Sequence, residues 1–546
     1  MNILYIMFDQ LRFDYLSCAG HPTLQTPNFD RIAARGVRFT NAYTQSPVCV
    51  PARMSAYTGR YVGSHGVQWN GHPLRVGEMT MGDHLRAAGT DCWIIGKTHM
   101  YADVAGMARL GIARDSRIGA RQAECGFDVW CRDDGLWAEG PGGAYDPKPS
   151  PYNAYLASRG YAGTNPWADF ANAAATDGAI ASGWLMENAD KPANIREEDS
   201  ETPWLTAEAI AFMRQAKDPW CAHVSYIKPH WPYIAPAPYH AMYGREDILP
   251  VVRDTRELDD PNPVYAAFTR LRVGQAFAQD RVREKVIPTY MGLVRQCDDQ
   301  LGRLLDFLEE TGRIDDTMIV LASDHGDYLG DHWMGEKHLF HAPSAKVPLI
   351  ICDPRTSADG TRGTTCDALV ELIDVTATII EAAGGTVPAH IVEGRSLLPY
   401  LHGAAPGDPR AFAISEYDFS GLPVCAQLGL APRDARLVMI ATERWKMTHC
   451  PAGIRPMLFD LLNDPRELND LGADPAHASV RAGLYEMMLG WSLRPAQRVT
   501  ISDEEILDAR ARSGDSGILL GLYDGSEVDP SLWGRYRGAA PGRPSG

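Results

Sequence analysis

The chain lacks any lysine- or arginine-rich run, although 52 of its 546 residues are lysine or arginine. Acidic residues outnumber the basic ones, and the formal net charge is −17. A protein that follows a nucleic-acid backbone needs clustered positive charge, so this pattern argues against nucleic acid as a partner. An anionic small molecule would have to be attracted by a local group of cations, because the overall charge repels it.

Long apolar runs are also lacking, and no stretch approaches the roughly 20 apolar residues that a membrane-spanning helix needs. The opening segment, MNILYIMFDQ, has neither the basic region nor the small-residue cleavage site of a signal peptide. We therefore expect no membrane association. The opening segment is interpreted instead as a buried strand of the fold.

The eleven cysteines include no C-x-x-C pair, and they are odd in number and scattered. This usage is not typical of a disulfide framework and favours a reducing compartment. We expect a cytoplasmic protein. The sequence also lacks internal repeats.

Strand-like and helix-like segments alternate along much of the chain. The predicted strands are residues 2–8, 37–43, 91–95, 220–227 and 317–322, and the predicted helices are residues 27–36, 51–58, 80–89, 206–215, 287–311 and 369–383. Such alternation is typical of an α/β fold, with helices on both faces of a large mixed, mostly parallel sheet.

Three further regions differ in character from these segments. Residues 101–199 are rich in glycine, proline, aspartate and tryptophan and are predicted to be a loop-rich insertion within a domain of residues 1–405. Residues 406–500 are predicted to form a smaller α+β domain with an antiparallel sheet. Its strands are expected at residues 411–417, 436–442, 445–449 and 457–460, and its helix at residues 480–491. Residues 501–546 hold little periodicity and are expected to form an extended tail.

The insertion contains four prominent aromatic residues, Trp130, Trp137, Tyr152 and Trp167. They could line a pocket for an aryl group. Aromatic residues in loops more often pack at contacts between domains or subunits, so both interpretations stay open.

Two polar pairs follow predicted strands, Asp9-Gln10 and Asp324-His325. Ligands of open α/β sheets gather at the carboxyl ends of strands, although an aspartate there can also cap a turn. Two such pairs in one chain with Cys49 favour a shared metal ion. The oxygen donors suit a hard cation, and the histidine adds a borderline nitrogen.

The segment Cys49-Val50-Pro51-Ala52-Arg53 stands at the start of a predicted helix. The cysteine could be only a small apolar residue at that position. The alternative is chemical: the helix N-terminus and the arginine one turn further on would both stabilise an anionic ester held there.

Residues 49–60, ending in Thr58-Gly59-Arg60, resemble the first signature of the sulfatase family, which belongs to the alkaline-phosphatase-like superfamily. A second family signature is similar to residues 89–99, with cysteine at position 92 where the family often has threonine. The resemblance extends over about residues 1–500. It implies an alkaline-phosphatase-like fold, in which Cys49 is oxidised to formylglycine and the hydrated aldehyde is the nucleophile.

The resemblance also implies a set of site residues. One divalent metal ion would be bound by Asp9, Gln10, Cys49, Asp324 and His325, and the further catalytic residues would be Arg53, Lys97, His99, His230 and Lys337. Arg53 and Lys97 would hold the sulfuryl oxygens, His230 and Lys337 would act on the leaving oxygen, and His99 would assist breakdown of the covalent sulfate ester. Asn70 would lie beside the nucleophile as a further substrate-binding residue.

Gln10 and His325 depart from the Asp-Asp and Asp-Asn pairs of many sulfatases and resemble the branch of bacterial arylsulfatases and phosphonate monoester hydrolases. This departure makes manganese as credible as calcium. Sulfate monoesters are the expected substrates, because Lys97 and His99 follow the usual sulfatase pattern. Phosphonate monoesters or phosphodiesters are the alternative, with promiscuity between the classes. The branch implies a homodimer or homotetramer in which the tail of residues 501–546 contacts another subunit. It also implies maturation by a formylglycine-generating enzyme.

Two other classes of protein remain as alternatives. One is a catalytically silent protein that binds metal or sulfate and keeps Cys49 unmodified. The other is a structural component of an oligomer, which would leave the group of cationic residues unexplained. The complete cysteine motif and the metal-site pairs favour the enzyme.

Overall fold

The computed structural model describes residues 1–135, 150–176, 178–404, 407–497, 499–511 and 530–532. The chain forms two compact units, Met1–Val387 with Val392–Arg494, and Pro388–Ile391 with Pro495–Gly546. In the second unit, α17 spans Asp503–Ala511. Much of the predicted tail lies outside the described residues, so its contact with another subunit stays a prediction, as do the predicted domain boundaries.

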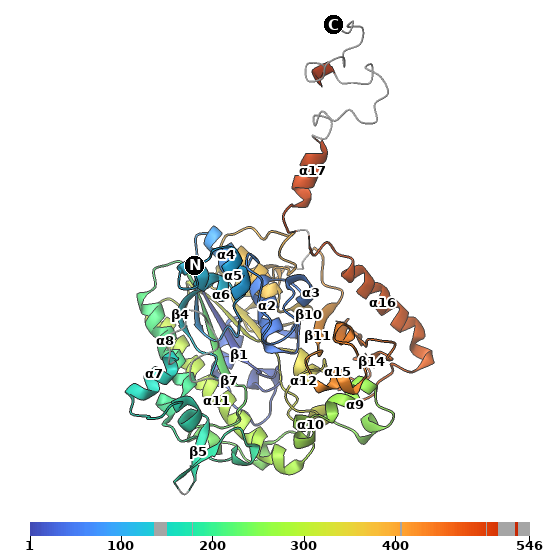
Figure 1. Cartoon of the computed structure of the whole chain (residues 1–546). Helices are drawn as coiled ribbons and strands as arrows, with labels where there is room; N and C mark the ends of the chain where they lie inside the picture. The colour runs from blue at the N-terminus through green and yellow to red at the C-terminus, as the bar shows by residue number, and fades with distance from the viewer. Residues whose placement is uncertain (136–149, 177, 405–406, 498, 512–529, 533–546) are drawn as a thin grey trace. The chain divides into compact units, whose positions relative to one another are not determined.

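An eight-stranded sheet organises the first unit (Figure 1). Its strands in spatial order are β10 (Thr364–Glu371), β2 (Val37–Tyr43), β9 (Leu349–Cys352), β8 (Thr317–Ser323), β1 (Asn2–Asp9), β7 (Trp220–Pro229), β3 (Asp91–Gly96) and β4 (Asp128–Arg132). β9 is antiparallel to both of its neighbours, and the other neighbouring pairs are parallel. The predicted large, mixed and mostly parallel sheet is therefore confirmed.

The central strand β1 is buried on both faces, which explains its continuous apolar run. Leu4, Ile6 and Phe8 face one hydrophobic core, and Ile3, Tyr5 and Met7 face the other. The first core is covered by α1 (Pro27–Arg35), α8 (Glu201–Gln215) and α11 (Asp280–Glu310). The second core is covered by α2 (Cys49–Thr58), α4 (Met81–Ala87) and α13 (Asp374–Ala382).

Two predicted helices have different bounds in the structure. The helix predicted at residues 369–383 is wrong at its start, because Leu369 and Val370 belong to β10 and pair with β2. A carboxylate oxygen of Asp374 accepts a hydrogen bond from the backbone of Glu371 at 2.8 Å, and this contact helps to separate the strand from α13. The helix predicted at residues 287–311 already begins at Asp280 and contains Pro288.

The region predicted as a loop-rich insertion contains more regular structure than expected. β4 lies within it and forms an edge of the main sheet. Charged residues at both ends of this short strand, Asp128 and Arg132, hide it from an apolar pattern. The region also holds a two-stranded hairpin of β5 (Ala173–Thr176) and β6 (Ala179–Ser182).

A second, antiparallel sheet confirms the predicted C-terminal sheet. Its strands in order are β11 (Ala413–Asp418), β12 (Arg436–Ala441), β13 (Trp445–His449) and β14 (Met457–Asp460). Leu484 and Met488 of α16 (Ala478–Ser492) pack on one face of this sheet. The other face packs against α9 (Pro263–Thr269) and the loops that follow β2 and β8.

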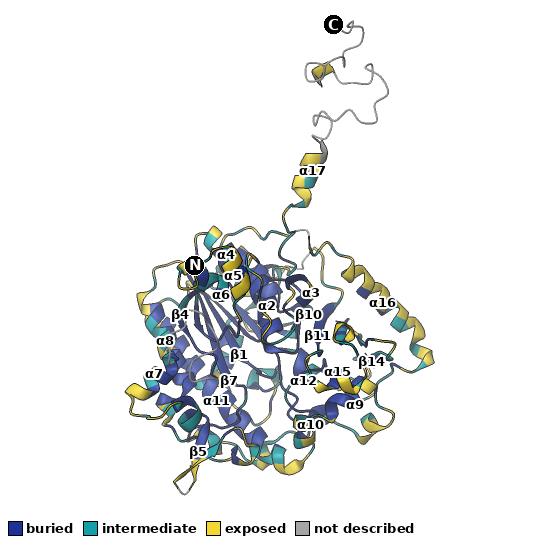
Figure 2. Ribbon diagram, in the orientation of Figure 1, coloured by how far each residue is buried: buried dark blue, intermediate teal, exposed yellow. Residues whose placement is uncertain are grey.

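Short helices connect these elements. They are α3 (Val62–His65), α5 (Val104–Arg109), α6 (Arg117–Ala123), α7 (Pro151–Ser158), α10 (Arg272–Phe277), α12 (Ala342–Ala345), α14 (Leu398–Leu401) and α15 (Pro423–Gln427). Figure 2 shows the central strands β1 and β7 of the main sheet buried and much of α16 exposed. No helix within the described residues has the length and apolar character needed to cross a membrane.

Candidate active site

Four neighbouring parallel strands deliver side chains to one edge of the main sheet. Asp9 ends β1, and Asp324 directly follows β8, whose Ser323 is in register with Phe8. His230 directly follows β7, and Lys97 directly follows β3. The carboxyl ends of parallel strands meet at one edge, so residues more than 300 positions apart in the sequence become neighbours.

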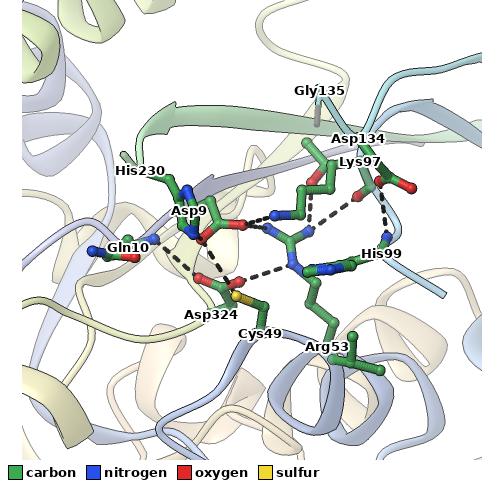
Figure 3. Close-up of polar contacts among 12 residues, drawn as sticks. Asp9, Gln10, Cys49, Arg53, Lys97, His99, Asp134, Gly135, His230 and Asp324 are labelled. Atoms are coloured by element: carbon green, nitrogen blue, oxygen red, sulfur yellow. Dashed lines mark hydrogen bonds and ion pairs between the residues drawn. The ribbon is translucent and has the colours of Figure 1, made fainter. Parts of the chain in front are cut away.

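Cys49 is the first residue of α2, and the whole of this helix is buried. Its N-terminal end points into the group of side chains at the strand ends (Figure 3). Asn70 holds this end of the helix, because its Oδ1 accepts a hydrogen bond from the backbone of Val50 at 3.0 Å. Asn70 therefore lies beside the nucleophile position, where the sequence predicted it.

Within the described residues, Asp9, Cys49, Asp324 and His325 form a buried group whose potential ligand atoms all lie within 4.8 Å of one another. His325 Nε2 lies 3.2 Å from Cys49 Sγ and 3.8 Å from a carboxylate oxygen of each aspartate. The other ring nitrogen of His325 lies 2.9 Å from the carbonyl oxygen of Gly326, which directs Nε2 into the group. Two carboxylates and an imidazole at this spacing fit a divalent cation.

Gln10 adds an oxygen donor to this group. Its Nε2 donates hydrogen bonds to Asp327 Oδ2 at 2.5 Å and to the Tyr233 hydroxyl at 3.3 Å. Because the nitrogen is engaged on that side, Oε1 is the amide atom that faces the site, and it accepts a hydrogen bond from Lys337 Nζ at 3.4 Å. Asp327 thus orients the predicted ligand Gln10 by accepting a hydrogen bond from its amide nitrogen.

Arg53 connects the two aspartates (Figure 3). Its guanidinium donates to Asp324 Oδ2 at 2.8 Å and to Asp9 Oδ2 at 3.1 Å, and its side chain is fully buried. Ser225 Oγ and the carbonyl oxygen of Lys97 accept further hydrogen bonds from it at 2.7 and 3.0 Å. In this arrangement Arg53 orients the carboxylates, and its predicted contact with the sulfuryl oxygens stays a prediction.

Two lysines and a histidine complete the group. Lys97 Nζ donates to Asp9 Oδ2 at 2.5 Å. Lys337 Nζ lies 3.1 Å from Cys49 Sγ and 3.2 Å from His230 Nε2, and all of these side chains are buried. These residues of the sequence-predicted set therefore meet around position 49.

The electrostatic environment favours negative charge at position 49. Burial and the neighbouring Asp9 would raise the pKa of the Cys49 thiol, but Lys337 and His325 outweigh them and lower it. Burial would likewise raise the pKa of Asp9, but the charges of Lys97 and Arg53 hold it well below its usual value. Any anionic group placed where Sγ lies is therefore stabilised.

His99 lies at the margin of the group, with a positive φ of 56°. Its backbone N–H donates to Asp134 Oδ1 at 3.0 Å, and its buried Nδ1 has no hydrogen-bond partner within the described residues. Burial and the charge of Lys97 lower its pKa well below the usual range, so the ring is neutral. A pKa held this low opposes protonation of the ring, so the role of His99 in breakdown of the covalent sulfate ester stays a prediction.

Sequence reasoning missed several supporting residues. Tyr233, Ser225 and Asp134 hold Gln10, Arg53 and His99 respectively. Ser225 lies within β7, Tyr233 lies shortly after the end of β7, and Asp134 follows β4. Their nearness to strand ends was the signal that could have identified them.

Of the aromatic residues of the insertion, Tyr152 and Trp167 are almost completely buried. The indole N–H groups of Trp167 and Trp130 donate to Glu201 and Glu208. Tyr152 and Trp167 lie within the first hydrophobic core, and Trp130 packs against it. Their predicted place at a contact between domains or subunits stays a prediction. Trp137 lies outside the described residues.

The comparisons with known proteins agree with this geometry. The sulfatase family model matches residues 1–385, and a model of the N-sulphoglucosamine sulphohydrolase C-terminal region matches residues 330–492. The multifunctional alkaline phosphatase superfamily protein PehA of Trinickia caryophylli is 32% identical over 527 residues, which cover 91% of this chain and 96% of the relative. An arylsulfatase of Clostridium perfringens is 29% identical over 86% of this chain and 90% of its own length.

A similar solved structure is the phosphonate monoester hydrolase of Silicibacter pomeroyi. It has a TM-score of 0.79 and 29% identity, and the match covers 92% of this chain and 98% of that protein. The family model matches more than half of the chain, and PehA is similar over nearly all of it. The chain therefore belongs to the sulfatase family of the alkaline phosphatase superfamily.

Proposed function

We propose that this protein hydrolyses sulfate monoesters, with a nucleophile made from Cys49. The observation that carries the proposal is the position of Cys49 Sγ, which lies 3.1 Å from Lys337 Nζ and 3.2 Å from His325 Nε2. The family implies formylglycine at this position, and Sγ marks the place of its oxygens. The surrounding charges stabilise an anion there, as the attack on a sulfate ester requires.

The donor set also fits the divalent metal that the family implies. When bound, the metal supplies positive charge that lowers the pKa of the nucleophilic hydroxyl and offsets charge on the ester oxygens. Asp9, Gln10, Asp324 and His325 would hold it together with the modified residue 49. The nitrogen of His325 favours manganese, and calcium remains the alternative.

The residues around position 49 divide the remaining work. Arg53 holds one oxygen of Asp9 and one of Asp324, which leaves the other oxygen of each directed toward the centre of the group. Lys97 and Lys337 carry positive charge beside the position that the ester oxygens would take. This arrangement is organised before the substrate arrives and needs little rearrangement during the reaction.

The proton for the leaving oxygen resides on Lys337. His230 Nδ1 lies 2.7 Å from the carbonyl oxygen of Trp231, which can only accept, so Nδ1 carries the ring proton. Burial holds the pKa of His230 well below its usual value, so Nε2 is unprotonated and accepts from Lys337 Nζ at 3.2 Å. Lys337 is therefore the proton donor of this pair, and His230 fixes its position.

A phosphonate monoester or phosphodiester is the second candidate substrate. It is favoured by Gln10 and His325 in the donor set and by similarity to a phosphonate monoester hydrolase over nearly the whole chain. The same cations would serve sulfur and phosphorus centres, so we propose some activity on both. The formylglycine-generating enzyme, the homodimer or homotetramer and the cytoplasmic location remain predictions.

The test combines the mass of the peptide that carries residue 49 with rates on three 4-nitrophenyl esters, a sulfate, a phenylphosphonate and a phosphodiester. Oxidation to formylglycine lowers the peptide mass by about 18 Da, and hydration brings the change back to about 0. We expect the converted protein to turn over the sulfate fastest. Full activity with unmodified cysteine would refute the nucleophile, and a faster phosphonate reaction would favour the second candidate.

A further inference from the structure

Two indole rings lead outward from the catalytic group. Trp231 directly follows His230, and the centroids of their rings lie 4.1 Å apart. The Trp231 indole N–H donates to Glu336 Oε1 at 2.7 Å, which fixes the orientation of the ring. Trp184 lies further out, with its ring centroid 5.3 Å from that of Trp231 and an angle of 55° between the planes.

Trp184 is exposed although its backbone is anchored. Gly183 donates a backbone hydrogen bond to the carbonyl oxygen of Asn172 at 2.8 Å. A Cβ at Gly183 would come within 2.5 Å of that same oxygen, so the close approach requires glycine. The next residue, Trp184, is nevertheless 49% exposed, although burial of an indole stabilises a fold. The half-exposed indole of Trp184, which packs on the Trp231 ring next to His230, is therefore available to a ligand.

The two rings lie next to the residues past which the leaving group of a bound ester would extend. In the proposed function Lys337 protonates the leaving oxygen and His230 positions it, and Lys337 Nζ lies 5.7 Å from the centre of the Trp231 ring. The organic part of an ester bound at position 49 must extend past these two residues. Aromatic rings pair at centroid distances of about 4.5 to 7 Å, the range in which Trp231 and Trp184 already lie from one another.

We propose that Trp231 and Trp184 form the subsite for a neutral aryl leaving group. This inference rests on the proposed function and names the substrate class of that site. Trp231 supplies the inner wall, fixed by Glu336, and Trp184 supplies the outer wall.

A cationic leaving group does not fit this subsite as well. A quaternary ammonium group needs an aromatic face that is free of other cations. Here the Trp231 ring already lies near the Lys337 ammonium. The nearby carboxylate of Glu336 is also engaged, with Lys337 Nζ at 3.7 Å and His338 Nε2 at 3.7 Å. A second cation would meet repulsion from Lys337 without a free carboxylate to offset it.

The test compares Trp184→Ala with Leu185→Ala. The control residue is the next in the chain, is 55% exposed and has no ring to pair with a substrate. The ratio of kcat/KM for 2-naphthyl sulfate to kcat/KM for ethyl sulfate is measured for each protein. We expect Trp184→Ala to lower this ratio about 3- to 10-fold, the range that one aromatic pair contributes, mainly through KM. Leu185→Ala should leave it unchanged.

A binding measurement separates the subsite from the chemistry. Naphthalene-2-sulfonate and ethanesulfonate cannot be hydrolysed at the C–S bond, so calorimetry reports their binding alone. If the wild-type protein hydrolyses no ester but Trp184→Ala still weakens binding of the naphthyl compound, the proposed function fails and the subsite stands. If neither the ratio nor the binding changes in Trp184→Ala, the subsite is refuted.

Two other outcomes would also overturn the proposal. Trp184→Ala could lower the mass of the protein in light scattering while the preference for aryl esters is unchanged, which would assign Trp184 to a contact between copies. Alternatively, Trp184→Ala could weaken turnover of choline sulfate as strongly as turnover of naphthyl sulfate. That result would show a general apolar or cation-binding surface instead of an aryl subsite.

Discussion

Replacement of Asp327 by asparagine tests how the site orients its amide ligand. Asp327 accepts three hydrogen bonds: Oδ1 from the backbone of Leu329 at 3.0 Å, and Oδ2 from Gln10 Nε2 and the Tyr233 hydroxyl, both at 2.5 Å. A carboxylate can accept on both sides, whereas an asparagine has one accepting atom and one donating group. The substitution therefore forces a conflict on one side.

Either orientation of the introduced amide disturbs the site. If its oxygen faces Gln10, its NH2 group opposes the backbone N–H of Leu329. If its oxygen faces Leu329, its NH2 group opposes Gln10 Nε2, and the Gln10 amide must turn its nitrogen toward the metal position. One unsatisfied buried donor costs about 1 to 3 kcal/mol. Loss of such support typically weakens metal binding about 10- to 100-fold.

The assay is calorimetric titration of Mn²⁺ and Ca²⁺ into protein freed of metal by a chelator, with a thermal melt of each metal-free protein. Tyr233→Phe is the comparison, because it removes one donor to Asp327 and the weaker, 3.3 Å acceptor of Gln10 Nε2 but leaves the carboxylate in place. We expect a 10- to 100-fold weaker Kd for Asp327→Asn and at most about a 3-fold change for Tyr233→Phe. Equal metal affinity in Asp327→Asn and the wild type would refute the assigned role of Asp327.

Three further changes test the electrostatics and the nucleophile. Arg53→Met should lower the free energy of unfolding of the metal-free protein by about 3 to 5 kcal/mol, because two buried carboxylates lose their shared cation. Added Mn²⁺ should reduce this decrease. An unchanged Tm of the metal-free variant would contradict the expectation. Cys49→Ala should keep the melting temperature and abolish turnover of aryl sulfate, so a fully active variant would refute the mechanism. Burial raises the pKa of Asp128, but two arginines of α6 outweigh it and lower the pKa to about 2. Since the folded pKa is below the unfolded one, this stabilisation is present above about pH 4 and is lost as the pH falls toward 2. Asp128→Asn should lower the free energy of unfolding by about 1 kcal/mol at pH 7, a value reduced because the arginines are partly exposed, and by less at pH 3. An equal decrease at both pH values would contradict this role of Asp128.

The fold class could be predicted because the decisive segments are long and buried on both faces. β1 and β8 are continuous apolar runs that end in polar pairs, and this pattern located both the sheet and the predicted metal ligands. β4 was not predicted because it is a short edge strand with charged ends, and its position depends on pairing with β3. Its contribution to the site, Asp134 behind His99, was hidden for the same reason.

The orientation of individual side chains could not be read from the sequence. The motif suggested that Arg53 faces the substrate, since it follows Cys49 by one helical turn. In the structure its guanidinium is fully buried and bridges Asp9 and Asp324. That outcome depends on how α2 packs against the ends of β1 and β8, which is a long-range property. The aromatic residues of the insertion behave similarly, because Tyr152 and Trp167 are buried by α8 and its neighbours.

The charge of the site explains why one centre can serve several ester classes. Gln10 is neutral where many family members have a carboxylate, so Asp9 and Asp324 carry two negative charges against a divalent ion and three cationic side chains, Arg53, Lys97 and Lys337. Sulfate monoesters, phosphonate monoesters and phosphodiesters each carry a single negative charge near neutral pH. A cationic centre attracts them about equally, because the Coulomb energy depends on charge and distance. This shared attraction does not distinguish one leaving group from another, so preference among leaving groups must come from the surrounding subsite, where Trp231 and Trp184 lie.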